Sequence, residues 1–205
     1  MANEEKPLRK MAEAFKELAN TLNCQTLNES AHLEVAPFSR ACTLVSPLFR
    51  CLGFAFKFAE IDYVAKVDDL AEASKSITTL HTMMEQDVQA NCVRRAGSHT
   101  RNLLRVKRGL DMVKVLFEQI IATEVTSLRD PASKAYTQVF APYHAWAIRK
   151  AVSAGMYALP TRFVVFLLIS EDSARTQMQN YVAACDTVIT YIDKLFISRD
   201  LGIDW

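Results

Sequence analysis

The chain has 205 residues, of which 50% are hydrophobic, with only 5 Gly and 6 Pro and a formal net charge of +1. That length fits a single domain over residues 1–205, the scarcity of turn-forming residues favours long helices, and the near-neutral charge excludes a general basic surface for nucleic acid. Five cysteines without a C-x-x-C motif indicate neither a disulfide framework nor a thiolate metal site, so we expect the protein in the reducing cytosol. No metal-site spacing and no P-loop or dinucleotide motif is present, so we expect neither a metal nor a cofactor.

Hydrophobic residues at helical spacing predict the first part of the fold. They recur from Leu8 to Leu22, which predicts an amphipathic helix, and the polar, irregular stretch Asn23–Ala36 is interpreted as a loop. The helical pattern resumes over Pro37–Gly53, where Pro47 should kink or restart the helix because its ring blocks a backbone hydrogen bond. Two further helices are predicted over Phe54–Ala73 and Thr79–Ala90.

The longest helix is predicted over His99–Ala122, with Ser98 as its N-cap after Gly97. Beyond Gly109 its apolar residues occupy nearly every side, which in a soluble protein indicates burial between layers. The longest wholly apolar run, Phe163–Ile169, is far shorter than the roughly 20 residues needed to span a bilayer. The remaining helices are predicted over Asp130–Phe140, Tyr143–Leu159, Arg162–Ser170 and Ser173–Ser198.

One face of the longest helix changes from cationic to apolar along its length. Arg101 and Arg105 lie four residues apart near its start, and the same face continues through Met112 and Leu116. A lipid with an anionic headgroup has this profile, whereas a solvated basic face should stay polar throughout. For the arginines taken alone, a solvated basic face is the alternative interpretation.

Two other segments repeat this arrangement of polar and apolar residues. Asp62 and Lys66 form another four-residue pair preceded by an apolar face, and His144 begins a face that passes through Ile148 and Ala151. If the longest helix runs antiparallel to these segments, the polar ends meet at one mouth and the apolar faces converge behind it. The alternatives are an ordinary exposed ion pair on the first segment and a structural role for the histidine.

Three stretches of the chain resemble a known family: Phe56–Lys66, Thr100–Leu110 and Tyr143–Trp146. They resemble the glycolipid transfer protein family, and the resemblance extends over almost the whole chain. It implies an all-α, two-layer helical sandwich with a lipid headgroup site at the surface and an apolar lipid pocket between the layers. The plant member that the chain resembles most implies a role in programmed cell death.

The resemblance also implies roles for five residues of the headgroup site. In the family, the aspartate and histidine that match Asp62 and His144 hold the amide of the ceramide. The glycolipid-binding branch has tryptophan and asparagine where this sequence has Arg105 and Lys66, whereas the phosphate-binding branch has cations at both positions. Lys66, Arg101 and Arg105 are therefore predicted to bind the phosphate of ceramide-1-phosphate or a related phosphosphingolipid, a role that suits guanidinium and ammonium groups.

A well-sealed apolar pocket is needed behind this headgroup site, because each methylene moved out of water is worth about 0.8 kcal/mol. Trp146 combines an apolar ring with a polar tip and is predicted to contact the membrane interface. The residues predicted to line the pocket are Phe49, Leu52, Phe58, Met112, Leu116, Ile148 and Ala151.

The function that these observations favour is a non-enzymatic carrier of ceramide-1-phosphate-like sphingolipids, cytosolic and monomeric, which docks transiently on membranes. The alternative is a helical interaction module that binds a phosphorylated protein segment, although such a ligand does not account for the apolar faces. An acid–base enzyme that uses Asp62 and His144 is the least favoured interpretation, since no catalytic motif is present.

Overall fold

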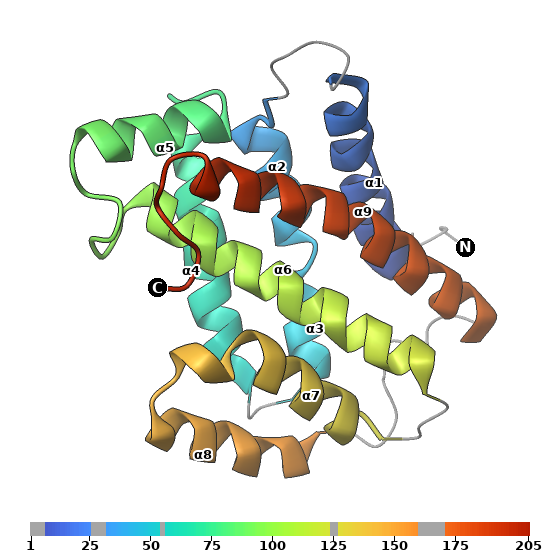
Figure 1. Ribbon diagram of the computed structural model, residues 1–205. Helices are drawn as coiled ribbons and strands as arrows, with labels where there is room; N and C mark the ends of the chain where they lie inside the picture. Colours follow the sequence, from blue (N-terminus) through green and yellow to red (C-terminus); the bar gives the residue numbers. More distant parts are fainter. Residues whose placement is uncertain (1–6, 26–31, 54–55, 124–126, 160–170) are drawn as a thin grey trace.

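The computed structural model describes residues 7–25, 32–53, 56–123, 127–159 and 171–205 (Figure 1). Within these ranges the chain is helical apart from turns, connecting segments and one isolated β-bridge. The predicted all-α fold class is therefore confirmed. The helices are α1 (Pro7–Gln25), α2 (Val35–Thr43), α3 (Ser46–Cys51), α4 (Lys57–Ala73), α5 (Leu80–Gln89), α6 (His99–Ala122), α7 (Arg129–Val139), the 3₁₀ helix η2 (Ala141–Tyr143), α8 (Trp146–Gly155), the 3₁₀ helix η3 (Met156–Ala158) and α9 (Glu171–Ile197).

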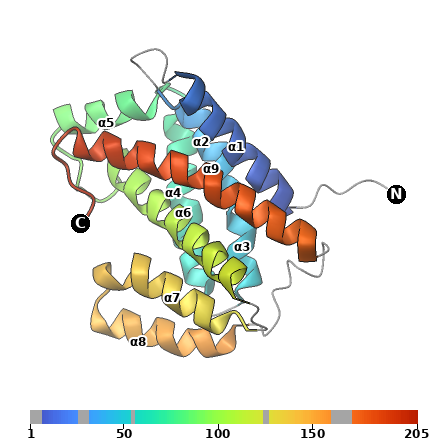
Figure 2. The same cartoon turned by 45° about the vertical axis from the view of Figure 1, so that its right-hand side comes forward.

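The helices pack in two layers, which can be followed in Figures 1 and 2. One layer contains α6, α7 and α9, with α6 packed against both of the others, and the second contains α2, α3 and α4. The layers meet where α6 packs on α4, while α1 packs along α9 and also contacts α2. This is the predicted two-layer sandwich. None of the helices in the described ranges is long and apolar enough to cross a membrane.

The central position of α6 follows from its sequence. Leu103, Leu104 and Phe117 are fully buried, and at about 100° per residue they occupy more than one side of the helix. Both layers can therefore pack on it, as predicted. Ser98 caps the helix by accepting a hydrogen bond from the backbone N–H of Arg101 at 3.1 Å.

A buried carboxylate from α5 completes the N-terminal cap of α6. One oxygen of Asp87 accepts hydrogen bonds from the backbone N–H of Thr100 at 2.7 Å and from the Ser98 hydroxyl at 3.1 Å. The other oxygen accepts from the Cys92 thiol at 3.3 Å. Burial alone raises the pKa of Asp87, but these hydrogen bonds outweigh it and hold the pKa below its ordinary value. The cap thus fixes the start of the helix that carries Arg101.

Replacing Asp87 with Asn is expected to lower the free energy of unfolding at pH 7 by about 1 to 2 kcal/mol, because a charged acceptor of several hydrogen bonds is lost. The folded-state pKa of Asp87 lies below its unfolded value. The ionised Asp87 side chain therefore stabilises the fold fully at pH values above its pKa in the unfolded chain, which is about 4. This stabilisation is lost as the pH falls through the pKa of Asp87 in the folded protein.

The stability difference between Asp87→Asn and the wild type should accordingly shrink as the pH is lowered from 7 toward about 3. Urea unfolding of both proteins at a series of pH values measures this difference in the free energy of unfolding. Asp68→Asn, which changes an exposed carboxylate on α4, is the matched control and should have little effect at any pH. A stability loss for Asp87→Asn that stays constant across the pH range contradicts the prediction.

The observed helix boundaries differ from the predicted ones by a few residues. The loop predicted over Asn23–Ala36 is shorter at both ends, because α1 and α2 extend into it, and residues 26–31 lie outside the described ranges. Pro47 stands in the first turn of α3, so it starts a new helix as predicted. The predicted helix start at Phe54 and the predicted helix over residues 162–170 fall on positions that the structure does not describe.

Candidate functional site

The helix α4 carries the first pair of predicted site residues. The Nζ atom of Lys66 forms an ion pair with the Asp62 carboxylate and donates a hydrogen bond to the Asp62 backbone oxygen at 3.2 Å. The side chain of Asp62 is 73% exposed, whereas that of Lys66 is 19% exposed. The lysine is therefore held against the protein surface while the carboxylate projects outward.

The first two turns of α6 carry two cations close to one another. Arg101 and Arg105 are both partly buried, and neither forms an ion pair with a carboxylate in the part of the chain that the structure describes. Burial lowers the pKa of Arg105 below its ordinary value and the charge of Arg101 lowers it further, while Asp62 and Tyr143 act in the opposite direction. The two guanidinium groups therefore repel one another.

His144 lies on the segment that joins η2 to α8. Its Nδ1 atom is 2.9 Å from the hydroxyl oxygen of Tyr136 on α7. Its ring also stacks on that of Phe140, with the ring centroids 5.6 Å apart and the planes at 17°. Two aromatic side chains therefore fix the position and the plane of the imidazole.

Electrostatic interactions place the histidine with the residues of α4 and α6. Burial lowers the pKa of His144, Arg105 and Arg108 lower it further, and Asp62 raises it. Because its pKa lies below the ordinary value, His144 is neutral at pH 7. Asp62, which is paired with Lys66, therefore interacts electrostatically with Arg105 and His144, and Arg105 interacts with Arg101. We call this set the polar cluster: Asp62, Lys66, Arg101, Arg105 and His144.

The predicted helical face that starts at His144 is wrong. His144 has extended backbone, with φ −100° and ψ 135°, and α8 begins only at Trp146. The chain has to leave the short η2 helix before α8 can start, so the helical spacing cannot be counted through this segment. Ile148 and Ala151 consequently do not follow His144 on one helix face, and both side chains are exposed.

A small apolar cavity of about 20 Å³ lies between α3 and α6. That volume holds roughly one water molecule, so the two helices are nearly closed on each other. The residues that line the cavity are Leu48, Phe49, Leu52, Met112, Val113, Leu116 and Phe117.

Four of the seven residues predicted for the lipid pocket line this cavity: Phe49, Leu52, Met112 and Leu116. The other three predicted residues lie elsewhere. Phe58 is 81% exposed on the first turn of α4, and Ile148 and Ala151 are exposed on α8. Helical spacing predicted that these three side chains lie behind the polar residues. In the structure they lie on helix faces of α4 and α8 that point away from the core.

Arg108 is a residue of this region that the sequence analysis did not identify as part of the site. It is buried, with 3% of its surface exposed, and its Nη2 donates hydrogen bonds to the backbone oxygens of Ile203 at 2.8 Å and Trp205 at 2.7 Å. Its guanidinium carbon lies 3.5 Å from the centroid of the Tyr143 ring, a cation–π contact. The C-terminal segment therefore braces the part of α6 that carries Arg105.

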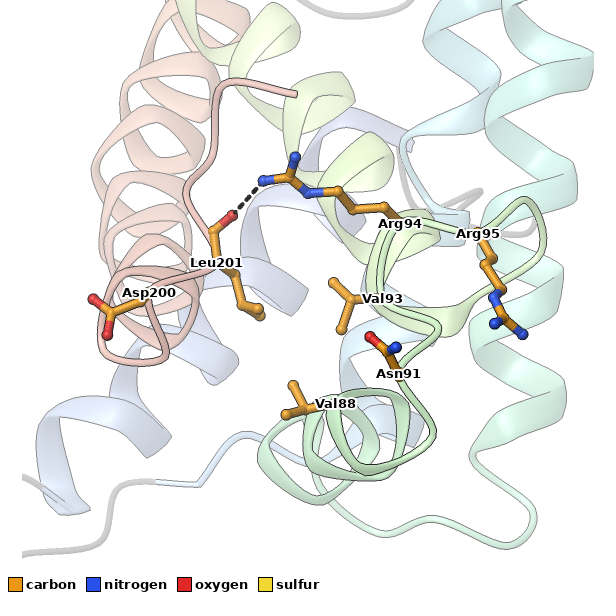
Figure 3. Close-up of a pocket in the computed structure, with 7 residues that line it drawn as sticks. All are labelled: Val88, Asn91, Val93, Arg94, Arg95, Asp200 and Leu201. Atoms are coloured by element: carbon orange, nitrogen blue, oxygen red, sulfur yellow. Dashed lines mark hydrogen bonds between the residues drawn. The ribbon is translucent and has the colours of Figure 1, made fainter.

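A larger cavity of about 480 Å³ lies between the α5–α6 loop and the C-terminal segment (Figure 3). Arg94 reaches toward that segment and donates a hydrogen bond to the Leu201 backbone oxygen at 3.3 Å, while Arg95 points elsewhere. No residue of the polar cluster borders this cavity. The larger of the two cavities is therefore not the one beside the predicted headgroup site. Its lining residues are Val88, Asn91, Val93, Arg94, Arg95, Asp200 and Leu201.

Large apolar side chains are exposed close to the polar cluster in the sequence. Phe58 and Ile61 precede Asp62 on α4, and both are exposed. Trp146, which is 67% exposed, follows His144 by two positions. Three large apolar side chains that neighbour residues of the polar cluster in the sequence are thus exposed.

The chain as a whole is similar to known proteins. Residues 33–171 match the family described as Glycolipid transfer protein (GLTP). The chain is 63% identical over 210 residues to accelerated cell death 11 of Arabidopsis thaliana, covering 100% of both chains. It is 28% identical over 170 residues to the ceramide-1-phosphate transfer protein of Danio rerio, covering 76% of this chain and 80% of that protein.

A solved structure shows the same fold at high similarity. It is a mutant of Arabidopsis accelerated cell death 11 in complex with C12 ceramide-1-phosphate. Its TM-score with this chain is 0.94 at 62% sequence identity, over 99% of this chain and 100% of that one. The fold that the sequence resemblance implied is therefore confirmed.

Proposed function

The chain belongs to the glycolipid transfer protein family, and from this membership we propose that it carries ceramide-1-phosphate between membranes without making or breaking a covalent bond. The polar cluster is the observation that supports this proposal most directly, because it combines three cations with a carboxylate and a neutral histidine. The relative that shares 62% identity was crystallised with this lipid. The carrier function also accounts for an apolar cavity on the helix that holds the two arginines.

The three cations bind the phosphate in this proposal. Arg101 and Arg105 offer planar groups with several donors, and Lys66 offers an ammonium group, which together suit a phosphate monoester. A bound phosphate relieves the repulsion between the two guanidinium groups that contributes to the lowered pKa of Arg105. It also competes with Asp62 for Lys66.

The other two residues of the polar cluster recognise the ceramide amide. A carboxylate accepts a hydrogen bond from the amide N–H, and a neutral imidazole N–H donates one to the amide C=O. When the phosphate engages Lys66, the exposed carboxylate of Asp62 is released for the amide. Binding of the two lipid groups is therefore linked, which favours a lipid that carries both of them.

The lipid chains enter between the layers, where the small cavity lies. The helices α3 and α6 have to separate for this, because about 20 Å³ cannot contain an acyl chain. Burial of a chain of about sixteen carbons contributes on the order of ten kcal/mol, at about 0.8 kcal/mol per methylene. Because this free energy is counted from water, it does not favour leaving a bilayer, but it keeps the chain in the protein once the protein has left the membrane.

The exposed apolar side chains near the polar cluster form the proposed membrane-docking surface. The ring of Trp146 suits the membrane interface, and the Nζ atom of Lys150 lies 5.9 Å from its centroid. A cation beside an exposed aromatic ring fits a surface of anionic lipid headgroups. We propose that the protein works as a cytosolic monomer that binds membranes weakly and reversibly.

A phosphorylated protein segment is not favoured as the ligand. It uses the three cations but leaves both the apolar cavity and the amide-directed pair of Asp62 and His144 without a role. An acid–base reaction at that pair receives no support from the family, which consists of lipid transfer proteins.

A vesicle assay tests the proposed function. The purified protein is expected to move fluorescent ceramide-1-phosphate from donor to acceptor vesicles. Unlabelled ceramide-1-phosphate should compete better than ceramide, which lacks the phosphate, and better than phosphatidic acid, which lacks the amide. Mass spectrometry of an organic extract should recover the lipid unchanged. Absence of transfer, or equal competition by all three lipids, counts against the proposal.

A further inference from the structure

The Tyr136 hydroxyl is the hydrogen-bond partner of one ring nitrogen of His144. The oxygen lies 2.9 Å from Nδ1, and the two residues are eight positions apart in the chain. The Phe140 ring, stacked at 17° to the imidazole, holds the plane of the ring. Among the residues that the structure describes, Nε2 has no hydrogen-bond partner, and the His144 side chain is partly exposed.

The tautomer of His144 decides what Nε2 can do. A neutral imidazole carries a single ring hydrogen. If Nδ1 accepts from the tyrosine hydroxyl, the hydrogen is on Nε2, which can then donate to an amide carbonyl oxygen. In the opposite tautomer Nε2 presents a lone pair, which repels that oxygen.

We propose that Tyr136 is a positioning residue, which donates its hydroxyl hydrogen to Nδ1 and thereby holds His144 in the tautomer with hydrogen on Nε2. The consequence for lipid binding rests on the proposed function, whereas the tautomer itself does not. The protonation states suit this assignment. Burial raises the pKa of Tyr136, so the hydroxyl keeps its hydrogen, and burial with Arg105 and Arg108 lowers the pKa of His144.

Nitrogen-15 NMR of histidine-labelled protein, at a pH above the titration of His144, tests the tautomer. We expect Nδ1 of the wild type to show the chemical shift of an unprotonated nitrogen and Nε2 that of a protonated one. Tyr136→Phe should give a mixture of both tautomers, because the donor hydroxyl is removed. The control is Tyr191→Phe, which removes a hydroxyl that accepts from the backbone N–H of Leu33; it should leave the His144 signals unchanged.

Two NMR results overturn the proposal. One is a wild-type spectrum with the hydrogen on Nδ1, since Tyr136 would then be an acceptor. The other is a Tyr136→Phe spectrum identical to that of the wild type, since the tautomer would then be set by other groups. Neither result depends on lipid being bound.

A double-mutant cycle measures the consequence for the ligand. Tyr136→Phe is expected to weaken binding of ceramide-1-phosphate by about 5- to 10-fold in the wild-type background. In a His144→Ala background the same change should have less than about a twofold effect, because its target is absent. Equal losses in both backgrounds mean that Tyr136 acts on the fold and overturn the proposal. If the wild type binds no lipid, the proposed function fails, and the NMR spectra still decide the role of Tyr136.

Discussion

Replacing Arg105 with Gln is expected to reduce ceramide-1-phosphate transfer by about 50-fold, because a hydrogen bond between two charged groups is lost. The same change should leave the thermal midpoint of unfolding unchanged or raise it. Burial and the neighbouring charge of Arg101 both lower the pKa of Arg105, so the positive charge is unfavourable until an anion binds. Loss of transfer without loss of stability identifies a residue that serves binding. Vesicle transfer rates and thermal unfolding measure the two effects.

Arg9→Gln is the matched control for this experiment. Arg9 lies on α1 and forms an exposed ion pair with Glu13 at 2.7 Å, and such pairs contribute little to stability. Its replacement should change neither transfer nor the thermal midpoint appreciably. A variant that carries both Arg101→Gln and Arg105→Gln should transfer no lipid above background. Transfer near the wild-type rate by this double variant contradicts the proposed phosphate site.

Replacing Gly109 with Ala is expected to lower the free energy of unfolding by about 3 kcal/mol, because another side chain already fills the space that the added methyl group would occupy. A Cβ atom at this position would lie 2.7 Å from two carbons of the Tyr63 ring. Tyr63 is buried, and its hydroxyl donates a hydrogen bond to the Cys42 backbone oxygen at 3.1 Å, so the ring cannot move away freely. At an open helix position the same change stabilises by about 1 kcal/mol. Urea unfolding gives the sign and the size.

The same experiment in a Tyr63→Leu background tests the cause. Without the aromatic ring, the methyl group added by Gly109→Ala no longer clashes with Tyr63. The decrease in the free energy of unfolding caused by Gly109→Ala should therefore be about 2 kcal/mol smaller in this background. Since α4 carries Asp62 and Lys66, Gly109→Ala should also reduce lipid transfer by displacing that helix. A neutral or stabilising effect of Gly109→Ala in the wild-type background contradicts the packing of α4 on α6 described above.

Local patterns account for the parts of the fold that were predicted correctly. The helix α6 was predictable because its cap at Ser98 and its apolar residues all lie within one continuous stretch. The pairing of Arg101 with Arg105 follows from helical spacing alone. Spacing within a helix does not show which helices meet. The residue pattern therefore joined Arg101 and Arg105 with Asp62 and His144 only on the condition that the helices run antiparallel, and the family resemblance implied the same grouping.

Contacts between distant parts of the chain account for what the sequence analysis missed. Arg108 lies in a basic stretch of sequence that is typical of a solvated surface. It is buried instead, because the C-terminal segment packs on it and two backbone oxygens, 95 and 97 positions further along the chain, accept its hydrogen bonds. His144 has apolar residues at helical spacing after it, yet its own backbone is extended. Phe58 fits an apolar face in the sequence and is exposed, because helical periodicity does not reveal which faces find a neighbour.

After delivery, an empty carrier has to cross water again before it can collect another lipid. The space between α3 and α6 measures only about 20 Å³, so the apolar side chains that line it are nearly closed off from water. Separating α3 from α6 removes contacts between the apolar side chains of the two helices, and lipid chains that enter from a bilayer replace these contacts. If the protein carries lipid as proposed, the cost of separating α3 from α6 therefore falls at the membrane surface, where lipid chains are present to enter.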